Sequence, residues 1–241
     1  MIREKLRTID AFLYPARCPM CDRPAPWPRP ACPECEGALH PLRRDTPVCG
    51  LCGRPMRDDR SEYCKDCRQI PRAFTRGCAA FRYREMASPV YRMKYSGRAE
   101  YADWFGMLCA RRIRETFPQP AQIQALVPVP VSPGRLEKRG YNQALLIARS
   151  TGEKLGIPVL DNVLLRTKNT EKMRAIGARA RRANLKSSFI VYGNDVKSKK
   201  IMLVDDVYTT GATMDACAQA LLDAGAKAVY FAVLAAGEDL S

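Results

Sequence analysis

The sequence predicts a parallel α/β domain preceded by a small pair of zinc ribbons. Eight of the 11 cysteines form four C-x-x-C pairs before Arg68. From Phe81 onward, apolar strand patterns alternate with amphipathic helix patterns, which indicates helices flanking a largely parallel sheet. The 241 residues, 46% of them hydrophobic, can bury one sizeable core. We therefore expect a ribbon domain over residues 1–71 and the α/β domain over residues 72–241.

The cysteine pairs have the spacing of zinc ligands. Disulfides do not persist in a reducing compartment, whereas each C-x-x-C turn supplies half of a tetrahedral zinc site. CPMCDRP returns as CGLCGRP, and a second pair follows each after 10 or 11 residues. We assign two structural zinc ions, one to Cys18, Cys21, Cys32 and Cys35 and one to Cys49, Cys52, Cys64 and Cys67. An interleaved arrangement uses the same ligands, so spacing alone does not choose between the two.

Four C-x-x-C copies without a thioredoxin-like βαβ context argue against a redox role. The ribbon region also holds 11 of the 18 prolines, so it is rich in loops and needs metal to fold. We expect the single histidine, His40, to be a linker residue. The cysteines outside the pattern are expected as core thiols: Cys78, Cys109 and Cys217.

The chain is strongly basic, with a net charge of +15 and a pI of about 9.5. Residues 72–241 carry +12 of this charge, which favours an anionic partner there, such as a phosphorylated metabolite or nucleic acid. The longest apolar runs are far shorter than the roughly 20 residues of a membrane span, and MIREKLRTID has no signal-peptide core. We therefore expect a cytoplasmic protein.

The elements of the α/β domain follow one another in a regular order. The first are a helix at 99–117, a strand at 125–130 ended by prolines, and a helix at 142–156 that stops at Gly156. The pattern then predicts strands at 158–166, 187–192, 200–206 and 227–235, with a helix from about 212 to 224 before the last strand.

The segment IMLVDDVYTTGAT at 201–213 carries the clearest chemical signal. A buried strand ends in two carboxylates, and a turn of small residues then opens a helix. The carboxylates can accept hydrogen bonds from ribose hydroxyls, while free amides at the helix N-terminus can hold a phosphate. Ligands of open parallel sheets bind at this edge. The segment therefore predicts a site for a phosphorylated sugar.

All 13 positions resemble the phosphoribosyl-pyrophosphate (PRPP) signature of type I phosphoribosyltransferases. The resemblance implies that Asp205 and Asp206 contact the ribose hydroxyls and that Mg²⁺ bridges the pyrophosphate. It also implies a 5′-phosphate site formed by Thr209, Thr210, Gly211, Ala212 and Thr213. Purine-salvage relatives that have a base-interacting carboxylate carry it at the position of Thr209, so this motif names no general base.

Further blocks resemble the ComF/ComFC family, known as competence protein F. They are MKYSGR at 93–98, VPVPVSPGRLEKRGYNQA at 127–144, and a set of spaced residues: Arg166, Thr170, Arg181, Asn184 and Phe189. The double zinc ribbon extends this resemblance over nearly the whole chain. The family usually has Gln where this chain has Met173. Members are implicated in the uptake of transforming DNA, which implies handling of single strands.

Two segments are candidates for binding phosphate groups beside the signature. The pyrophosphate loop is expected at VPVPVSPGR, with Val131 and Ser132 as backbone donors and Arg135 or Arg139 as the charged contact. Asn142 and Gln143 could instead cap the next helix. The basic stretch 166–186 can close over pyrophosphate as a lid or contact a DNA backbone, and its principal candidates are Arg166, Arg179, Arg181 and Arg182.

Residues 72–98 interleave basic side chains with aromatic ones, which are Phe74, Phe81, Tyr83, Tyr91 and Tyr95. This mixture can stack the bases of single-stranded DNA, or its aromatics can face the core. Three functions remain: a competence factor that binds PRPP and single-stranded DNA, with other competence proteins as partners; a transferase that moves phosphoribose from PRPP to a base or other nucleophile; and a non-catalytic PRPP sensor. The first is our leading hypothesis.

Overall fold

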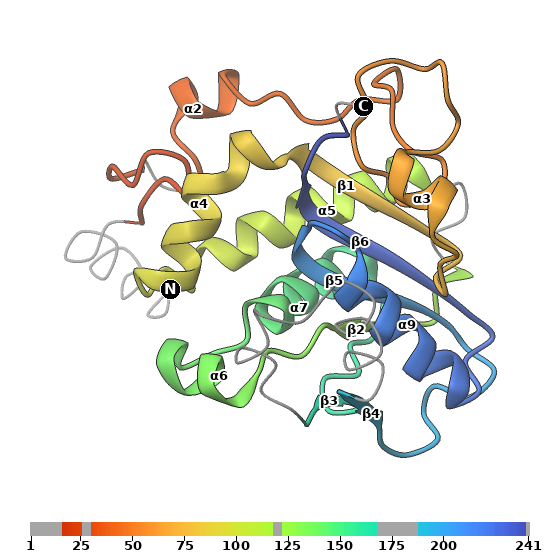
Figure 1. Ribbon diagram of the computed structural model, residues 1–241. Coiled ribbons are helices and arrows are strands. Elements are labelled where there is room, and N and C mark those ends of the chain that lie inside the picture. The colour runs from red at the N-terminus through yellow and green to blue at the C-terminus, as the bar shows by residue number, and fades with distance from the viewer. Residues whose placement is uncertain (1–15, 26–29, 118–121, 168–187, 240–241) are drawn as a thin grey trace.

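A sheet of four parallel strands forms the centre of the computed structural model, which describes residues 16–25, 30–117, 122–167 and 188–239 (Figure 1). The strands lie in the order β1-β6-β5-β2. A bridge between Leu126 and Val159 extends the sheet beyond β2. The bounds are β1 (Arg76–Arg82), β2 (Ala125–Pro128), β5 (Lys200–Tyr208) and β6 (Ala228–Ala236). The α/β class predicted from the sequence is confirmed.

Both faces of the sheet are buried, each in its own core layer. On β5, Leu203 belongs to one hydrophobic cluster, while Met202 and Val204 belong to the other. On β6, Phe231 and Ala232 divide in the same way. Successive side chains of a strand point to opposite faces, so continuous apolar strands such as these require helices on both sides.

Helices supply the two outer layers (Figure 1). α4 (Tyr83–Tyr95), α5 (Tyr101–Thr116) and α7 (Gln143–Leu155) contribute to one layer, and α9 (Ala212–Asp223) to the other. Asn142 caps α7 by accepting the Ala144 amide hydrogen bond, and Gly156 ends that helix with a φ of 70°. No helix in the described parts of the chain has the length and apolar composition to cross a membrane.

The expected strand at 158–166 is wrong as a single element. Val159 makes the edge bridge to Leu126, whereas β3 (Leu164–Arg166) pairs antiparallel with β4 (Phe189–Val191) in a separate two-stranded sheet. Asp161 and Asn162 interrupt the apolar run and turn the chain between the two pieces. The shorter elements of the fold are α2 (Pro33–Gly37), α3 (Lys65–Gln69) and α6 (Pro133–Arg139).

Close packing of α5 on α7 depends on Gly106. A Cβ atom at this position would lie 2.4 Å from the Cβ of Ser150 and 2.8 Å from the backbone nitrogen of Thr151. We expect Gly106→Ala to lower the free energy of unfolding by about 1–3 kcal/mol, because the helices must separate. Urea unfolding measures this loss. Gly37→Ala is the matched control, since a Cβ there meets nothing within 4 Å, and an equal loss in both variants would contradict the packing argument.

Candidate functional site

The eight paired cysteines gather into two separate clusters of four. One holds Cys18, Cys21, Cys32 and Cys35, the other Cys49, Cys52, Cys64 and Cys67, and the sulfur atoms of each cluster lie within 4.8 Å of one another. The Cys21 and Cys32 sulfurs are 3.8 Å apart, and the Cys52 and Cys64 sulfurs 3.7 Å. Four thiolates at about 2.3 Å from one zinc ion are separated by about 3.8 Å, so both clusters fit tetrahedral zinc. The structure therefore selects tandem over interleaved pairing.

The two ribbons pack against opposite core layers. Cys18 and Cys32 belong to the layer of α4 and α5, whereas Cys49, Cys52 and Cys64 belong to the layer of α9. Apolar contacts thus join each cysteine cluster to the α/β domain. His40 is exposed and belongs to neither cluster.

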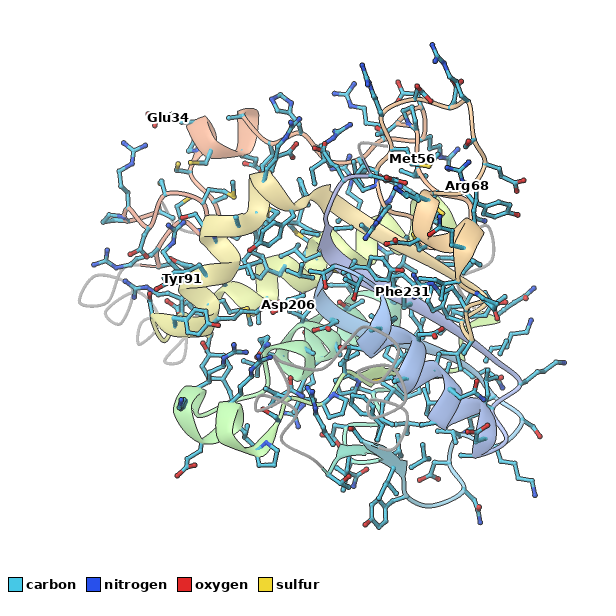
Figure 2. All side chains as sticks on the ribbon, in the orientation of Figure 1. Glu34, Met56, Arg68, Tyr91, Asp206 and Phe231 are labelled. Atoms are coloured by element: carbon cyan, nitrogen blue, oxygen red, sulfur yellow. The ribbon has the colours of Figure 1, made fainter. Side chains whose placement is uncertain are left out.

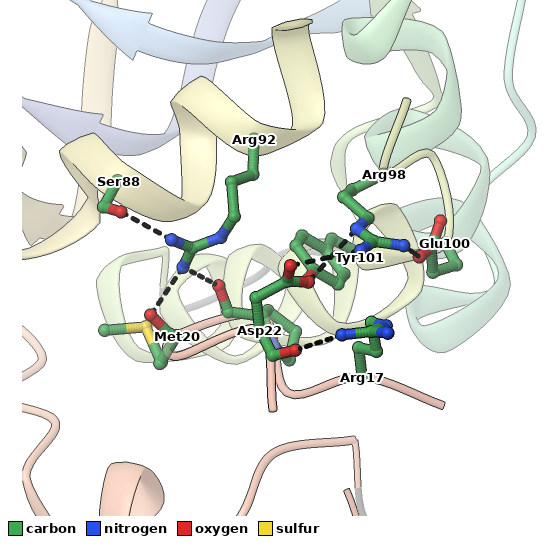
Figure 3. Close-up of polar contacts among 9 residues, drawn as sticks. Arg17, Met20, Asp22, Ser88, Arg92, Arg98, Glu100 and Tyr101 are labelled. Carbon is green, nitrogen blue, oxygen red and sulfur yellow. Dashed lines mark hydrogen bonds and ion pairs between the residues drawn. The ribbon is translucent and has the colours of Figure 1, made fainter. Parts of the chain in front are cut away.

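Side chains of α4, of α5 and of the turn between them hold the first ribbon (Figure 3). Arg92 donates to the carbonyl oxygens of Pro19 and Met20 at 2.8 and 2.5 Å. Asp22, at a φ of 61°, accepts from Tyr101 and pairs with Arg98 at 3.1 Å. The hydrogen bond from Tyr101, with the nearby Arg98, holds the pKa of Asp22 below its usual range. Arg98 ends the MKYSGR block, so this block anchors the ribbon.

The strand order reverses between β2 and β5. From β2 the chain continues outward to the bridge at Val159, whereas from β5 it continues inward to β6. Such a reversal opens a crevice at the carboxyl ends of the two strands, where open α/β sheets bind ligands. The acidic pair lies here, near the end of β5, and Figure 2 shows Asp206 near the centre of the molecule.

The two carboxylates have different surroundings. Asp206 is 4% exposed and lies 2.7 Å from Nζ of Lys94 on α4. Asp205 Oδ1 accepts the backbone N–H of Asp206 at 2.8 Å. Burial and the neighbouring carboxylate of Asp206 raise the pKa of Asp205 to about 8, although Lys94 opposes this shift. The site therefore holds one ion pair and one carboxyl group that resists ionisation.

The raised pKa of Asp205 predicts a pH-dependent stability. The ordinary value is 3.8, so the folded state holds this proton more tightly than the unfolded chain. The stability that the protonated Asp205 contributes to the fold is fully present below about pH 3.8 and is lost as the pH rises through about 8. We expect Asp205→Asn, which cannot ionise, to be more stable than the wild type at about pH 8.5. The difference in the free energy of unfolding should be smaller at about pH 6. Urea unfolding at both values checks this.

The exposed Asp223 provides the control for that experiment, because Asp223→Asn removes a carboxylate from the far end of α9. Its effect on the free energy of unfolding should be the same at both pH values. A pH-independent effect of Asp205→Asn would contradict the assigned environment of the acidic pair.

The turn after β5 leads directly into α9. Gly211 is the N-cap residue, with a φ of 77°, and a Cβ atom there would lie 2.3 Å from the Tyr208 hydroxyl oxygen. Only glycine fits both the backbone angle and this close approach. Ala212 and Thr213 begin the 12-residue helix, and the N–H of Ala212 donates to Thr210 Oγ1 at 3.5 Å. We name residues 209–213 the phosphate loop, and their binding of phosphate stays a prediction.

The predicted pyrophosphate loop lies beside the acidic pair. The N–H of Val129 donates to Val204 at 2.9 Å, and Asn142 Nδ2 donates to the Val129 carbonyl oxygen at 3.2 Å. Val131 and Ser132 follow within three residues, and Ser132 is 1% exposed, with no hydrogen-bond partner for its hydroxyl among the described residues. Val131 and Ser132 stay predicted backbone donors of this loop.

The two arginine candidates of this loop differ. Arg135 is exposed on α6. Arg139 instead turns toward α4: its Cζ lies 5.0 Å from the centre of the Tyr95 ring, and it donates to the Tyr95 hydroxyl at 3.2 Å. Tyr141, also from this segment, donates to the carbonyl oxygen of Met93. The end of α4 and the 139–141 turn are therefore joined by polar contacts.

The aromatic residues of the 72–98 stretch divide between the core and the surface. Phe74 and Phe81 are 2% and 1% exposed, so the core interpretation holds for them. Tyr83, Tyr91 and Tyr95 on α4 are 43%, 61% and 63% exposed, and Figure 2 labels Tyr91 on this helix. The Tyr91 and Tyr95 rings lie 4.9 Å apart. We name Tyr91, Tyr95 and Arg139 the tyrosine platform.

The lid candidates are mostly beyond what the structure describes. Arg166 ends β3, with its Cζ 5.5 Å from the centre of the Phe189 ring. The other candidates lie outside the described residues: Thr170, Arg181 and Asn184 of the family motif, Met173, and the basic residues Arg179 and Arg182. The three cysteines expected as core thiols are buried, at 1%, 1% and 0% exposed for Cys78, Cys109 and Cys217.

Sequence reasoning missed three cations around the site. Lys94 pairs with Asp206, while Arg54 and Arg72 donate to carbonyl oxygens of the phosphate loop. Lys94 lies in the MKYSGR block, which was a signal for it. Arg54 and Arg72 are separated from the loop by about 140 to 155 residues, so no local pattern indicates their contacts.

Two family profiles agree with this architecture. The profile of the Double zinc ribbon domain matches residues 9–68, and that of the Phosphoribosyl transferase domain matches residues 153–240. Among solved structures, a purine phosphoribosyltransferase from Pyrococcus horikoshii aligns over 56% of this chain and 71% of its own, at 21% identity and a TM-score of 0.35.

Named relatives cover most of the chain. Competence protein F of Haemophilus influenzae is 29% identical, over 82% of this chain and 93% of the relative. Competence protein ComFC of Bacillus subtilis is 30% identical, over 75% and 74%. DNA utilization protein YhgH of Escherichia coli is 31% identical, over 81% and 86%. With a phosphoribosyltransferase domain joined to a double zinc ribbon, the chain belongs to the ComF/ComFC family of competence and DNA utilization proteins.

Proposed function

We propose that the protein binds PRPP with Mg²⁺ at the carboxyl edge of the sheet and holds single-stranded DNA on the adjoining surface. The observation that carries the first half is the position of the acidic pair and the phosphate loop, side by side where the strand order reverses. The relatives named for competence and DNA utilization support the second half.

Each part of PRPP has a chemical counterpart at this edge. Asp205 and Asp206 can accept hydrogen bonds from the ribose hydroxyls, and the amides of the phosphate loop can donate to the 5′-phosphate. Mg²⁺ neutralises charge on the pyrophosphate when it is bound. Lys94, at 2.7 Å from Asp206, offsets one carboxylate charge and so lowers the repulsion between this edge and an anionic ligand.

The tyrosine platform supports contact with single-stranded DNA. Two neighbouring exposed rings give stacking surfaces that accept any base, and the guanidinium of Arg139 adds a positive charge beside them. The platform adjoins the proposed PRPP site, because Tyr95 directly follows Lys94, which contacts Asp206. We therefore propose that the single-stranded DNA runs across α4 and the end of α6.

Calorimetric titration of the purified protein with PRPP tests this function. We expect a binding signal with Mg²⁺ and none when excess EDTA, present in both the syringe and the cell, chelates the Mg²⁺. The protein is prepared without EDTA, so that it retains its zinc until the titration. Zinc content is measured before and after, so that loss of ribbon zinc is not mistaken for loss of Mg²⁺. Absence of binding with Mg²⁺ present would refute the PRPP half of the proposal.

A fluorescent oligonucleotide tests the DNA half. We expect single strands to bind more tightly than the matching duplex, with an affinity that falls as salt rises, because both phosphate contacts and stacked bases contribute. Equal affinity for duplex and single strand would contradict a stacking site. Repeating the PRPP titration with DNA present measures any coupling between the two ligands.

A further inference from the structure

The second ribbon contacts the phosphate loop on the side of the α9 core layer. Its Cys49, Cys52 and Cys64 lie in the same hydrophobic cluster as Tyr208, the residue before the loop. The ribbon approaches closely at Gly53, where a φ of 68° is combined with a Cβ position 2.5 Å from the Gly77 carbonyl oxygen. The ribbon is therefore seated on the sheet with no room for adjustment at this point.

Arg54 joins the zinc cluster to the loop. It is 8% exposed and donates through Nη1 to Asp66 at 3.0 Å and through Nη2 to the carbonyl oxygen of Thr209. Its guanidinium also lies 5.5 Å from the centre of the Tyr208 ring. Asp66 lies between the zinc ligands Cys64 and Cys67 on α3. Arg54 follows the Cys49–Cys52 pair, and its partner Asp66 lies within the Cys64–Cys67 pair. The fold of the ribbon around all four cysteines therefore sets the position of Arg54.

A second set of contacts comes from the segment that follows the ribbon. Arg72 Nη2 donates to the carbonyl oxygen of Thr210 at 3.1 Å. The N–H of Ala73 donates to Asp215 in the first turn of α9 at 2.6 Å. Two successive loop carbonyls and the start of the helix are therefore held by residues 54–73.

These contacts orient the amides predicted to bind phosphate. In a trans peptide the N–H points opposite to the carbonyl of the same unit. Arg54 holds the carbonyl of Thr209, so the N–H of Thr210 points away from the ribbon, and Arg72 fixes the N–H of Gly211 in the same way. The guanidinium groups of the buried Arg54 and the half-buried Arg72 also add positive charge behind the loop.

We propose that Arg54 and Arg72 are positioning residues for the phosphate loop, and that zinc at the second ribbon keeps Arg54 in place. Affinity for PRPP with Mg²⁺ then depends on the metal in the second ribbon. This inference rests on the PRPP binding proposed above. The first ribbon is a comparison, because the polar contacts described for it go to α4, to α5 and to Arg98 in the turn between them.

Four variants test the proposal in the full chain: Cys67→Ser, Cys35→Ser, Arg54→Met and Arg54→Lys. Zinc content, PRPP titration and hydrogen exchange over residues 205–215 are measured for each. We expect Cys67→Ser to lose one zinc and Arg54→Met to keep two, with both binding PRPP at least tenfold more weakly and exchanging loop amides faster. Arg54→Lys, which keeps a donor, should recover part of the affinity. Cys35→Ser should lose one zinc and leave loop exchange unchanged.

Two results separate the inference from the proposed function. Unchanged loop exchange in Cys67→Ser and Arg54→Met would overturn the positioning role. Faster loop exchange in those variants, together with a wild type that binds no PRPP, would support positioning of the loop and refute PRPP as its ligand.

Discussion

Replacing both members of the acidic pair, in Asp205→Asn with Asp206→Asn, is expected to weaken binding of PRPP with Mg²⁺ by at least about a hundredfold. Hydrogen bonds to a charged group contribute about 1.5–3 kcal/mol each, and every 1.4 kcal/mol corresponds to about tenfold in affinity. At about pH 8.5, where Asp205 is largely ionised as well as Asp206, the variant replaces two charged acceptors at the proposed ribose position. Calorimetric titration against the wild type at the same Mg²⁺ concentration measures the loss.

The acidic-pair variant should still hold two zinc ions, because neither aspartate is a ligand of either cluster. Urea unfolding of the variant shows whether the fold persists, since Lys94 loses its charged partner. Asp223→Asn controls for a general loss of negative charge. Affinity within threefold of the wild type would mean that the acidic pair is not the ribose site.

Removing the two rings of the tyrosine platform, in Tyr91→Ala with Tyr95→Ala, should weaken binding of a single-stranded oligonucleotide by about tenfold to a hundredfold or more. Stacking of a base on an aromatic ring contributes about 1–3 kcal/mol. The slope of affinity against salt concentration should stay the same, because the variant removes no positive charge. Fluorescence anisotropy at several salt concentrations measures both quantities.

Tyr192→Ala is the matched control for the platform, since Tyr192 is 56% exposed and directly follows β4. Arg139→Gln, unlike the tyrosine variant, should reduce the slope of affinity against salt concentration, by about one phosphate contact. An unchanged affinity in Tyr91→Ala with Tyr95→Ala would remove α4 from the DNA path.

Local spacing was enough to predict several parts of the structure. The C-x-x-C pairs identified the eight cysteines that gather into two clusters suited to zinc, because a tetrahedral site needs thiolates on tight turns. The helix ended by Gly156 was predicted because the left-handed conformation at a helix end favours glycine. The continuous apolar strand before Asp205 identified β5 for the same kind of local reason.

Contacts between distant segments were not predictable in this way. Tandem and interleaved zinc pairing use identical ligands, so only the fold could choose. Phe81 and Tyr91 occur in one basic stretch, yet the first faces the core from β1 and the second faces solvent from α4. Arg54 lies in the ribbon, and its contact with Thr209 depends on how the ribbon packs on the sheet.

The central claim is that the amides of the phosphate loop bind the phosphate of PRPP. Its most direct test is a ¹⁵N–¹H spectrum of protein labelled at threonine and glycine, recorded during titration with PRPP and Mg²⁺. We predict that the amide resonances of Thr210 and Gly211 shift in a saturable manner, while those of Gly37 and Gly156 do not. Saturable binding that leaves Thr210 and Gly211 unshifted would contradict this site, and so would the absence of any shift at saturating PRPP.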